Sequence, residues 1–292
     1  MDRLRRSMLY VPGSSMKMLE KSKELEADSL IIDLEDAVAI SQKDAARDIV
    51  CSALKKLDFG NKEKNVRINA LSTPFGKTDI EAIAGAKPDA LVIPKVNRAE
   101  DIKEVEALVE ALERRSGLEP GSISLHAMIE TPLAIININS IASSSKRLRA
   151  MLFGAADYTK ETRGKITKER LELLYPLNKI VLAARVSGID AIDSPYFDVK
   201  DQEGLIHHTK IARNMGYDGK SVIHPAQIKP VNEIFTPSKE EIEFAKKVID
   251  AFNEAEAKGI GATVVDGHLV EKLHVETAKR TLMIAQKAGI VN

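Results

Sequence analysis

The sequence predicts an α/β fold, a (βα)₈ TIM barrel with a helical and hairpin extension at its C-terminus. Short runs rich in Ile, Val and Leu alternate with longer segments whose apolar residues recur at helical spacing. Eight such pairs follow one another without a long break in composition. A doubly wound open sheet more often has about five or six strands, so the count favours a closed barrel.

The expected strands are short apolar runs, and nearly all of them end in a polar residue. They are Ser7–Pro12, Ser29–Glu35, Asn65–Ala70, Ala90–Lys95, Ser124–Glu130, Ala150–Asp157, Asp190–Ser194 and Lys220–His224. The expected helices between them have Gly or Pro near several of their ends. They are Met16–Ala27, Gln42–Lys56, Lys77–Gly85, Ala99–Ser116, Leu133–Ser144, Lys168–Ser187 and Glu203–Met215.

The residues after His224 exceed what a barrel needs. A helix is expected over Ser238–Lys258 and another at the C-terminus, and the run Val265-Asp266-Gly267-His268 predicts a tight turn between two short strands. We therefore expect a catalytic barrel of residues 1–235 and an extension of residues 236–292 that packs over a neighbouring subunit.

Composition excludes several classes of partner. The 292 residues contain 43 basic and 43 acidic side chains, with no stretch that concentrates Lys and Arg, so nucleic acid is not an expected partner. No segment reaches the roughly 18 apolar residues of a membrane span, and the apolar run after Arg6 is too short for a signal peptide. With Cys51 as the only cysteine, no intrachain disulfide is possible. A cytoplasmic protein is expected.

Ionisable and amide side chains lie at the end of nearly every expected strand. In barrels of this kind the active site lies at the carboxyl ends of the strands, so these side chains are expected to converge on one mouth. For a single residue, capping a helix or pairing with a neighbour is an equally good interpretation, and convergence from six strands weakens it. The residues are Asp33, Glu35, Asp36, Arg67, Asn69, Lys95, Glu130, Asp157, Asp193 and His224.

Glu130 and Asp157 end two consecutive expected strands. Two adjacent carboxylates repel each other, and a hard divalent ion explains their pairing better. Mg²⁺ commonly takes one or two carboxylates together with water and substrate oxygens. Lys95 leaves two possibilities open, an ion-paired structural lysine or a Schiff-base nucleophile.

Runs spread in order over nearly the whole chain resemble the citrate lyase β-subunit family, which includes malyl-CoA and citramalyl-CoA lyases within the HpcH/HpaI aldolases. The combination is specific to the family and not to one member of it. The runs are Arg5–Gly13, Ile32–Val38, Arg67–Asn69, Ile93–Lys95, Ile129–Thr131, Gly154–Tyr158 and Gly219–Pro225.

The resemblance implies a barrel that assembles as a homotrimer or hexamer and holds Mg²⁺ through Glu130 and Asp157. It implies that Arg67 binds the oxo acid and shares in stabilising the enolate, with Asn69 and Lys95 also expected at the substrate. Two departures stand out. Many relatives carry an acidic residue where this chain has Ala156, and His268 replaces the usual Lys.

The same resemblance implies that the segment of Pro12, Gly13 and Lys17 lies near the phosphates of the thioester carrier, and that Asp266 lies over the site of a neighbouring subunit. β subunits of citrate lyase more often have Asn at the position of Asp266. The aspartate therefore favours a stand-alone enzyme for CoA thioesters.

Together these features predict a Mg²⁺-dependent carbon–carbon lyase. It would cleave a 3-hydroxyacyl thioester, such as citramalyl-CoA, malyl-CoA or citryl-CoA, into acetyl-CoA and a 2-oxo acid (pyruvate, glyoxylate or oxaloacetate). Glu35, Asp36 or Asp266 would move the protons. Two alternatives stay open: a malyl-CoA thioesterase in which Asp266 activates water, and a β subunit that acts on a carrier-protein thioester only within a citrate lyase complex.

Overall fold

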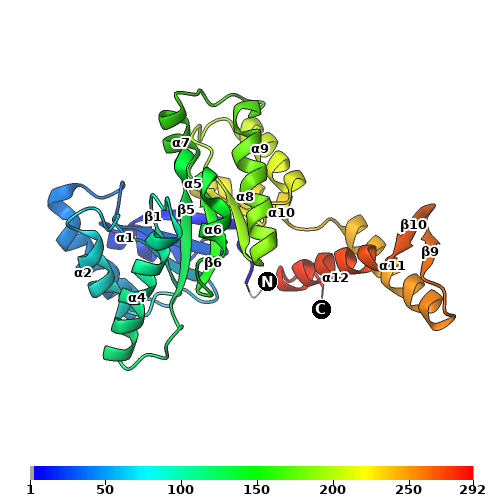
Figure 1. Ribbon diagram of the computed structural model, residues 1–292, viewed down its shortest axis with the longest axis horizontal. Coiled ribbons are helices and arrows are strands. Elements are labelled where there is room, and N and C mark those ends of the chain that lie inside the picture. Colours follow the sequence, from blue (N-terminus) through cyan, green and yellow to red (C-terminus); the bar gives the residue numbers. More distant parts are fainter. Residues whose placement is uncertain (1–2, 292) are drawn as a thin grey trace. The chain divides into compact units, whose positions relative to one another are not determined.

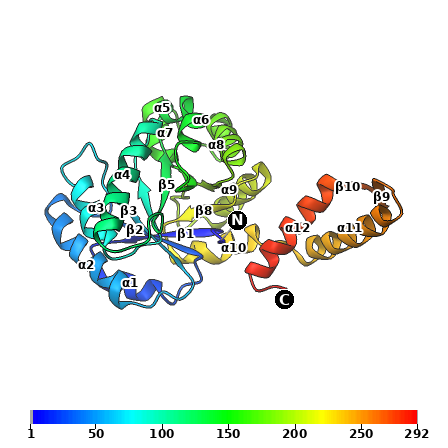
Figure 2. The same ribbon diagram turned by 60° about the horizontal axis from the view of Figure 1, so that its bottom comes forward.

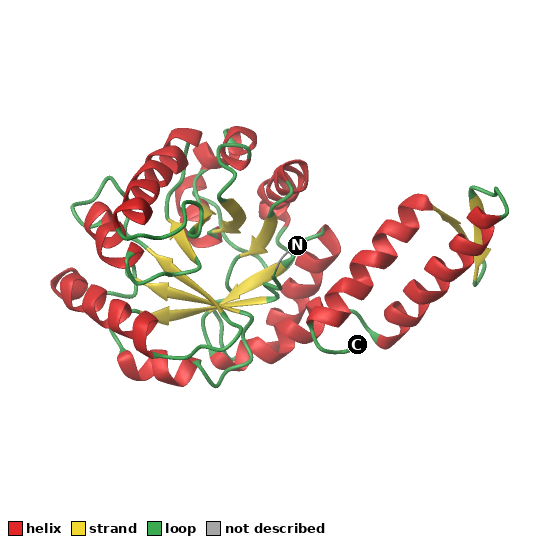
Figure 3. Ribbon diagram, turned by 90° about the horizontal axis from the view of Figure 1, so that it is seen from below, coloured by secondary structure: helices red, strands yellow, loops and turns green. Residues whose placement is uncertain are grey.

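A computed structural model describes residues 3–291 of the chain. Eight parallel strands close into a barrel in sequence order, because β1 pairs with both β2 and β8 (Figure 3). Helices surround this barrel (Figure 1). The barrel strands are β1 (Ser7–Pro12), β2 (Ser29–Asp33), β3 (Glu63–Arg67), β4 (Ala90–Ile93), β5 (Ser124–Ile129), β6 (Leu148–Phe153), β7 (Asp190–Asp193) and β8 (Gly219–Val222).

The α-helices and three short 3₁₀ helices follow the predicted alternation. Those of the barrel region are α1 (Met16–Ser22), η1 (Ile40–Gln42), α2 (Lys43–Lys56), α3 (Gly76–Ala84), α4 (Ala99–Arg115), α5 (Pro132–Ile136), α6 (Ile138–Ala142), α7 (Ala155–Thr162), η2 (Leu171–Leu173), α8 (Leu174–Ser187), α9 (Gln202–Met215), η3 (Pro225–Gln227) and α10 (Ile228–Phe235). Further along lie α11 (Lys239–Ala257), β9 (Ala262–Val265), β10 (His268–Glu271) and α12 (Lys272–Lys287).

The predicted barrel is confirmed, but most expected strands extend past the observed ends, and the difference matters most at β6. The expected strand Ala150–Asp157 ends at Phe153, and Asp157 lies instead in the first turn of α7. Gly154 makes the change of direction, with its N–H donating to the carbonyl of Ile129 at 3.0 Å. A carboxylate in the first turn also favours the helix, because it faces the positive end of the helix dipole.

Contacts divide the chain into two compact units, residues 5–232 and residues 233–291 together with residues 3–4. The predicted boundary after residue 235 falls at the end of α10. In the second unit α11 and α12 pack against each other, and the hairpin of β9 and β10 connects them (Figure 2). The predicted turn at Asp266 and Gly267 is confirmed.

An apolar layer fills the middle of the barrel. Its side chains come from six different strands and point to the same interior. Burying each large one contributes about 1.5–3 kcal/mol, so this layer fixes which residues of every strand point inward. Its members are Met8, Ile31, Val92, Met128, Ala150, Leu152 and Ile192.

Polar side chains lie on either side of this layer, around Arg5 at the amino ends of the strands and around Arg67 at the carboxyl ends. Within residues 3–291 no helix is long and apolar enough to cross a membrane.

Candidate active site

Arg67 is the centre of the cluster at the barrel mouth. It ends β3 in register with Asp33 of β2, and its Nε and Nη2 each lie 2.7 Å from one oxygen of the Asp33 carboxylate. Its guanidinium carbon lies 5.1 Å from the centre of the Tyr10 ring. Burial alone would lower the pKa of Arg67, but hydrogen bonding to Asp33 keeps it above its ordinary value. Arg67 is therefore a fixed and permanently charged cation.

Two further carboxylates share the remaining side of Arg67. Its Nη1 lies 3.1 Å from Glu35 Oε2 and 3.2 Å from Asp36 Oδ2. Glu35 is 8% exposed and also faces Lys95 Nζ at 3.4 Å, whereas the Asp36 side chain is 66% exposed. Burial raises the pKa of Glu35 even though Arg67 and Lys95 act against it. The structure thus brings Arg67, Glu35, Asp36 and Lys95 together, and it gives Glu35 an increased affinity for a proton.

Glu130 lies deeper in the same mouth. It is 2% exposed, and its Oε1 accepts a hydrogen bond from the backbone N–H of Lys95 at 2.6 Å. Lys95 has a φ of 52°, a conformation that costs a non-glycine residue energy and is typical of functional sites. Burial raises the pKa of Glu130 to about 7, with Glu35 and Asp157 adding repulsion.

Gly154 makes room for the Glu130 carboxylate. A Cβ added at Gly154 would lie 2.6 Å from Glu130 Oε2, closer than real Cβ contacts. Asp157, three residues later in α7, is half-buried, and its charge contributes to the raised pKa of Glu130. Two carboxylates that repel each other, with no salt bridge to either among residues 3–291, fit a small hard cation.

Such a cation would depend on these two carboxylates and on oxygens from outside the chain. Among residues 3–291 no group of three His, Cys, Asp or Glu side chains is arranged to hold a metal ion. A cavity of about 540 Å³ opens beside Lys95, between the segments that follow β3 and β4. Its walls include Ser72, Asn97 and Leu133.

Asn69 has its amide group engaged by the protein itself. Its Nδ2 donates to the carbonyl of Leu34 at 2.9 Å and to Asp79 Oδ2 at 2.6 Å. Its Oδ1 accepts no hydrogen bond from residues 3–291, so substrate binding by Asn69 stays a prediction that depends on that atom.

The segment between β1 and α1 packs closely on β2. Gly13 donates its N–H to the carbonyl of Asp33 at 2.8 Å, and a Cβ there would lie 2.7 Å from that oxygen. Pro12 is half-buried, and Lys17 is exposed in the first turn of α1. A contact of this segment with carrier phosphates stays a prediction.

Asp193 and His224, which were expected at the mouth, have structural contacts instead. Asp193 is fully buried and pairs with Arg170 and Lys220, each at 2.6 Å. Its neighbour Ile192 belongs to the interior layer, so Asp193 points to the outside of the barrel, and its expected convergence with the mouth residues was wrong. His224 Nδ1 accepts from the N–H of Ala226 at 3.1 Å and so caps η3.

Sequence reasoning missed Tyr10 and Met128 as parts of the mouth. The Tyr10 hydroxyl points at Met128 Sδ at 4.0 Å, and Arg67 Nη1 lies 3.9 Å from the same sulfur. Tyr10 stands two positions after the interior residue Met8, and Met128 stands two positions before Glu130, so the alternation of strand residues could have identified both.

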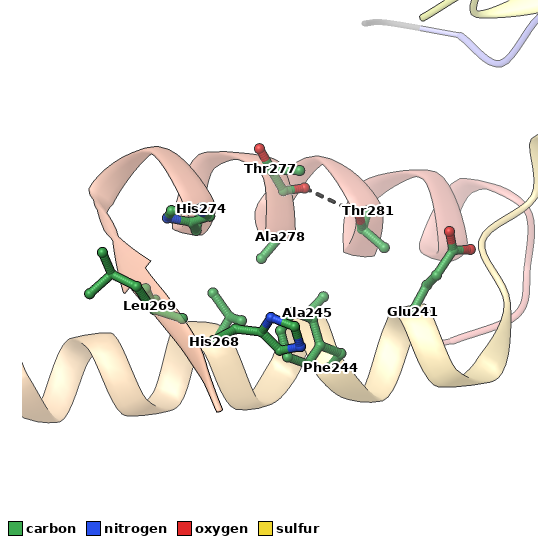
Figure 4. A pocket seen from close by; sticks show the side chains of 11 residues that line it. Glu241, Phe244, Ala245, His268, Leu269, His274, Thr277, Ala278 and Thr281 are labelled. Atoms are coloured by element: carbon green, nitrogen blue, oxygen red, sulfur yellow. Dashed lines mark hydrogen bonds between the residues drawn. The ribbon is translucent and has the colours of Figure 1, made fainter. Parts of the chain in front are cut away.

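Asp266 belongs to the second unit and takes a φ of 48° in the hairpin turn. Its carboxylate lies 2.8 Å from Lys247 Nζ of α11, and its side chain is 55% exposed. The same unit has a cavity of about 410 Å³ between α11, β10 and α12, where His268 packs edge-on against Phe244 (Figure 4). Leu269 and Leu273 are each 59% exposed in this unit.

The fold and the mouth define an α/β-barrel enzyme that works at the carboxyl ends of its strands. A family model described as HpcH/HpaI aldolase/citrate lyase matches residues 6–225. The chain is 43% identical over 281 residues to a (3S)-malyl-CoA thioesterase of Cereibacter sphaeroides, covering 96% of this chain and 94% of that protein. It is 38% identical over 291 residues to the citrate lyase subunit beta of Leuconostoc mesenteroides, covering 100% and 96%.

A solved structure of CitE from Mycobacterium tuberculosis, in complex with magnesium, acetoacetate and coenzyme A, superposes with a TM-score of 0.78. That protein is 27% identical, and the match covers 98% of this chain and 99% of the other. The chain belongs to the HpcH/HpaI aldolase/citrate lyase family.

Proposed function

We propose that the protein is a Mg²⁺-dependent lyase that cleaves a 3-hydroxyacyl thioester into an acetyl thioester and a 2-oxo acid. The observation that carries this proposal is the excess of acid at the mouth. Five carboxylates, Asp33, Glu35, Asp36, Glu130 and Asp157, share the mouth and its supporting turn with three cations, Arg67, Lys95 and Lys43. A site that must bind an anionic substrate needs a further positive charge.

Glu130 and Asp157 are the residues that would hold Mg²⁺. When bound there, Mg²⁺ supplies Lewis-acid polarisation of the hydroxyl and carboxylate oxygens of the substrate. The relative from M. tuberculosis supports the choice of metal, since its structure contains magnesium together with acetoacetate and coenzyme A.

Arg67 would bind the substrate carboxylate through Nη1, because Asp33 occupies the edge formed by Nε and Nη2. Nη1 would exchange its contact with the exposed Asp36 for the substrate. Glu35 or Asp36 then takes the proton of the substrate hydroxyl. The bond between the carbinol carbon and the thioester α-carbon breaks, and its electron pair forms the thioester enolate, which a returning proton converts to the acetyl thioester.

Asp266 is the third acid that we propose for proton transfer, contributed by a neighbouring subunit. The exposed side chains of Leu269 and Leu273 support assembly, because covering exposed apolar surface with another protein is favourable. We propose a homotrimer or hexamer. Mixing an Asp266→Ala chain with a Glu130→Ala chain, each inactive alone, should restore partial activity. No recovery despite proven subunit exchange would leave Asp266 an ordinary turn residue.

A second candidate function is hydrolysis of malyl-CoA. It is favoured by the 43% identity to proteins named (3S)-malyl-CoA thioesterase, against 38% to a citrate lyase subunit beta. The same mouth would then direct water at the thioester carbonyl. Because the chain is also similar to citrate lyase subunit beta, the test includes a third outcome, in which the protein acts on a carrier-protein thioester only within a complex.

The test is a product assay with the purified protein. Citramalyl-CoA, malyl-CoA and citryl-CoA are each supplied with Mg²⁺, and acetyl-CoA, free CoA and the oxo acids pyruvate, glyoxylate and oxaloacetate are measured. Acetyl-CoA plus an oxo acid is expected, and a chelator should abolish its formation. Free CoA with malate would establish the thioesterase instead. Inactivity on all three, with activity restored by partner subunits and a carrier-protein thioester, would establish the complex-bound subunit.

A further inference from the structure

The turn that carries Glu35 and Asp36 has its backbone fixed from within. Asp33 Oδ1 accepts the N–H of Glu35 at 2.9 Å, and Asp33 Oδ2 accepts the N–H of Ala37 at 2.9 Å. The same carboxylate binds Arg67. The buried Asp33 carboxylate therefore fixes both the backbone of the turn and the position of Arg67, which faces the turn.

The carbonyl groups of this turn are fixed from behind by two buried side chains. The Leu34 carbonyl accepts from Lys43 Nζ at 2.7 Å and from Asn69 Nδ2 at 2.9 Å, and the Glu35 carbonyl accepts from Lys43 Nζ at 2.7 Å. Lys43 is 6% exposed and Asn69 is 4% exposed. Both side chains bond only backbone carbonyls of the turn, so the Glu35 carboxylate is left to face Arg67 and Lys95.

Asp79 of α3 fixes the orientation of Asn69. It is fully buried, and its Oδ2 accepts from the backbone N–H of Asn69 at 2.8 Å and from Asn69 Nδ2 at 2.6 Å. Its Oδ1 accepts from Arg47 Nη1 of α2 at 2.9 Å. Because one Nδ2 hydrogen of Asn69 is donated to Asp79, the other is directed at the Leu34 carbonyl.

We propose that Asp79 and Asn69 are positioning residues for the acids of the mouth, a role that rests on the proposed function. The chain of contacts runs from α2 and α3 through Asp79 and Asn69 to the Leu34 carbonyl, and from there to Glu35 and Asp36. This assigns Asn69 to the support of the turn rather than to contact with the substrate. Small displacements of a reacting group cost large factors in rate, so such support is needed.

Glu113 offers a matched control at the other end of the barrel. It is fully buried, accepts from Arg147 at 2.7 Å and accepts backbone N–H groups of Gly121 and Ile123 at 2.9 Å each. Like Asp79 it is a buried helix carboxylate bonded to an arginine and to backbone N–H groups. Unlike Asp79, it holds the segment before β5, and its hydrogen-bond partners within residues 3–291 include no mouth residue.

The experiment compares Asp79→Asn with Glu113→Gln in the full chain. Hydrogen exchange of the peptide covering residues 33–40, measured without substrate, should become faster in Asp79→Asn and stay unchanged in Glu113→Gln. kcat should fall about tenfold or more in Asp79→Asn with a smaller change in KM. Glu113→Gln should keep the kcat of the wild type, even if its Tm falls by as much as that of Asp79→Asn.

Equal behaviour of the two variants would overturn the proposal. Asn69→Ala is the second variant, for use if Asp79→Asn does not fold. A lower kcat with faster hydrogen exchange in this variant would support the positioning role. A raised KM with unchanged exchange would make Asn69 a substrate ligand and overturn the proposal. Because exchange is read without substrate, a wild-type chain that lacks the proposed activity would refute that function and leave the positioning result readable.

Discussion

The two ends of the barrel interior are built alike and charged differently. At the amino ends Arg5 binds Glu63 through Nε and Nη2 at 2.8 and 2.5 Å and reaches Asp190 with Nη1 at 2.5 Å. At the carboxyl ends Arg67 binds Asp33 in the same two-pronged way and turns Nη1 toward two further acids. Each end thus has one arginine clamped by one buried carboxylate.

The two ends differ in how much positive charge lies near the remaining buried acids. Burial raises the pKa of Glu63, but His126 and Arg5 lower it to about 2, so this acid is satisfied within the chain. Burial raises the pKa of Glu130 to about 7, with no arginine in direct contact to counter it among the described residues. Buried charge alone therefore does not indicate function. A buried acid that the fold leaves short of positive charge does.

Removing one carboxylate at each end of the barrel should give the largest difference in kcat between the two ends. Asp157→Ala should cost at least about 10² in kcat, since it would remove a ligand of a catalytic cation. Asp190→Asn should lower Tm and leave kcat near that of the wild type. Steady-state kinetics and thermal unfolding of both variants check this. A normal rate in Asp157→Ala would show a structural carboxylate in place of a ligand.

Exchanging the arginine at each end should separate binding from stability. Arg67→Lys keeps the charge but loses the two parallel hydrogen bonds to Asp33 that direct Nη1 toward the substrate, so KM for the thioester should rise by about tenfold or more. Arg5→Lys should leave KM unchanged and lower Tm, because it loses the same geometry where no substrate binds. An unchanged KM in Arg67→Lys would place Arg67 outside the substrate contacts.

The sequence predicted the barrel and the residues of the mouth because both follow from local patterns. Apolar runs give the strands, and Arg67 and Glu130 stand at or next to strand ends. The outward direction of Asp193 was misjudged because its position at a strand end was considered without the alternation set by Ile192. The partners of Asn69 could not be predicted, since Asp79 and Leu34 meet it only when α3 and β2 pack beside β3.

The smallest effect expected concerns pH and stability, and it distinguishes the two ends without any substrate. A carboxyl whose folded pKa is raised stabilises the fold below its unfolded pKa, and this stability is lost as pH rises through the folded value. For Glu130 the window runs from about 4.5 to about 7, and the loss is on the order of 3 kcal/mol. For Glu63 the sign is opposite: its contribution is present above about 4.5 and lost only as pH falls toward about 2.

In metal-free protein, Glu130→Gln should therefore raise Tm by a few degrees at pH 8, about 2–4 °C for each kcal/mol in a protein of this size, and change it little at pH 5. Glu63→Gln should lower Tm at both values, since it breaks a buried pair. Added Mg²⁺ should raise Tm of the wild type at pH 8 and not that of Glu130→Gln. Thermal unfolding at the two pH values, with and without Mg²⁺, measures all of this. A Glu130→Gln variant destabilised equally at pH 5 and pH 8 would mean that Glu130, like Glu63, is a carboxylate whose charge the fold already satisfies.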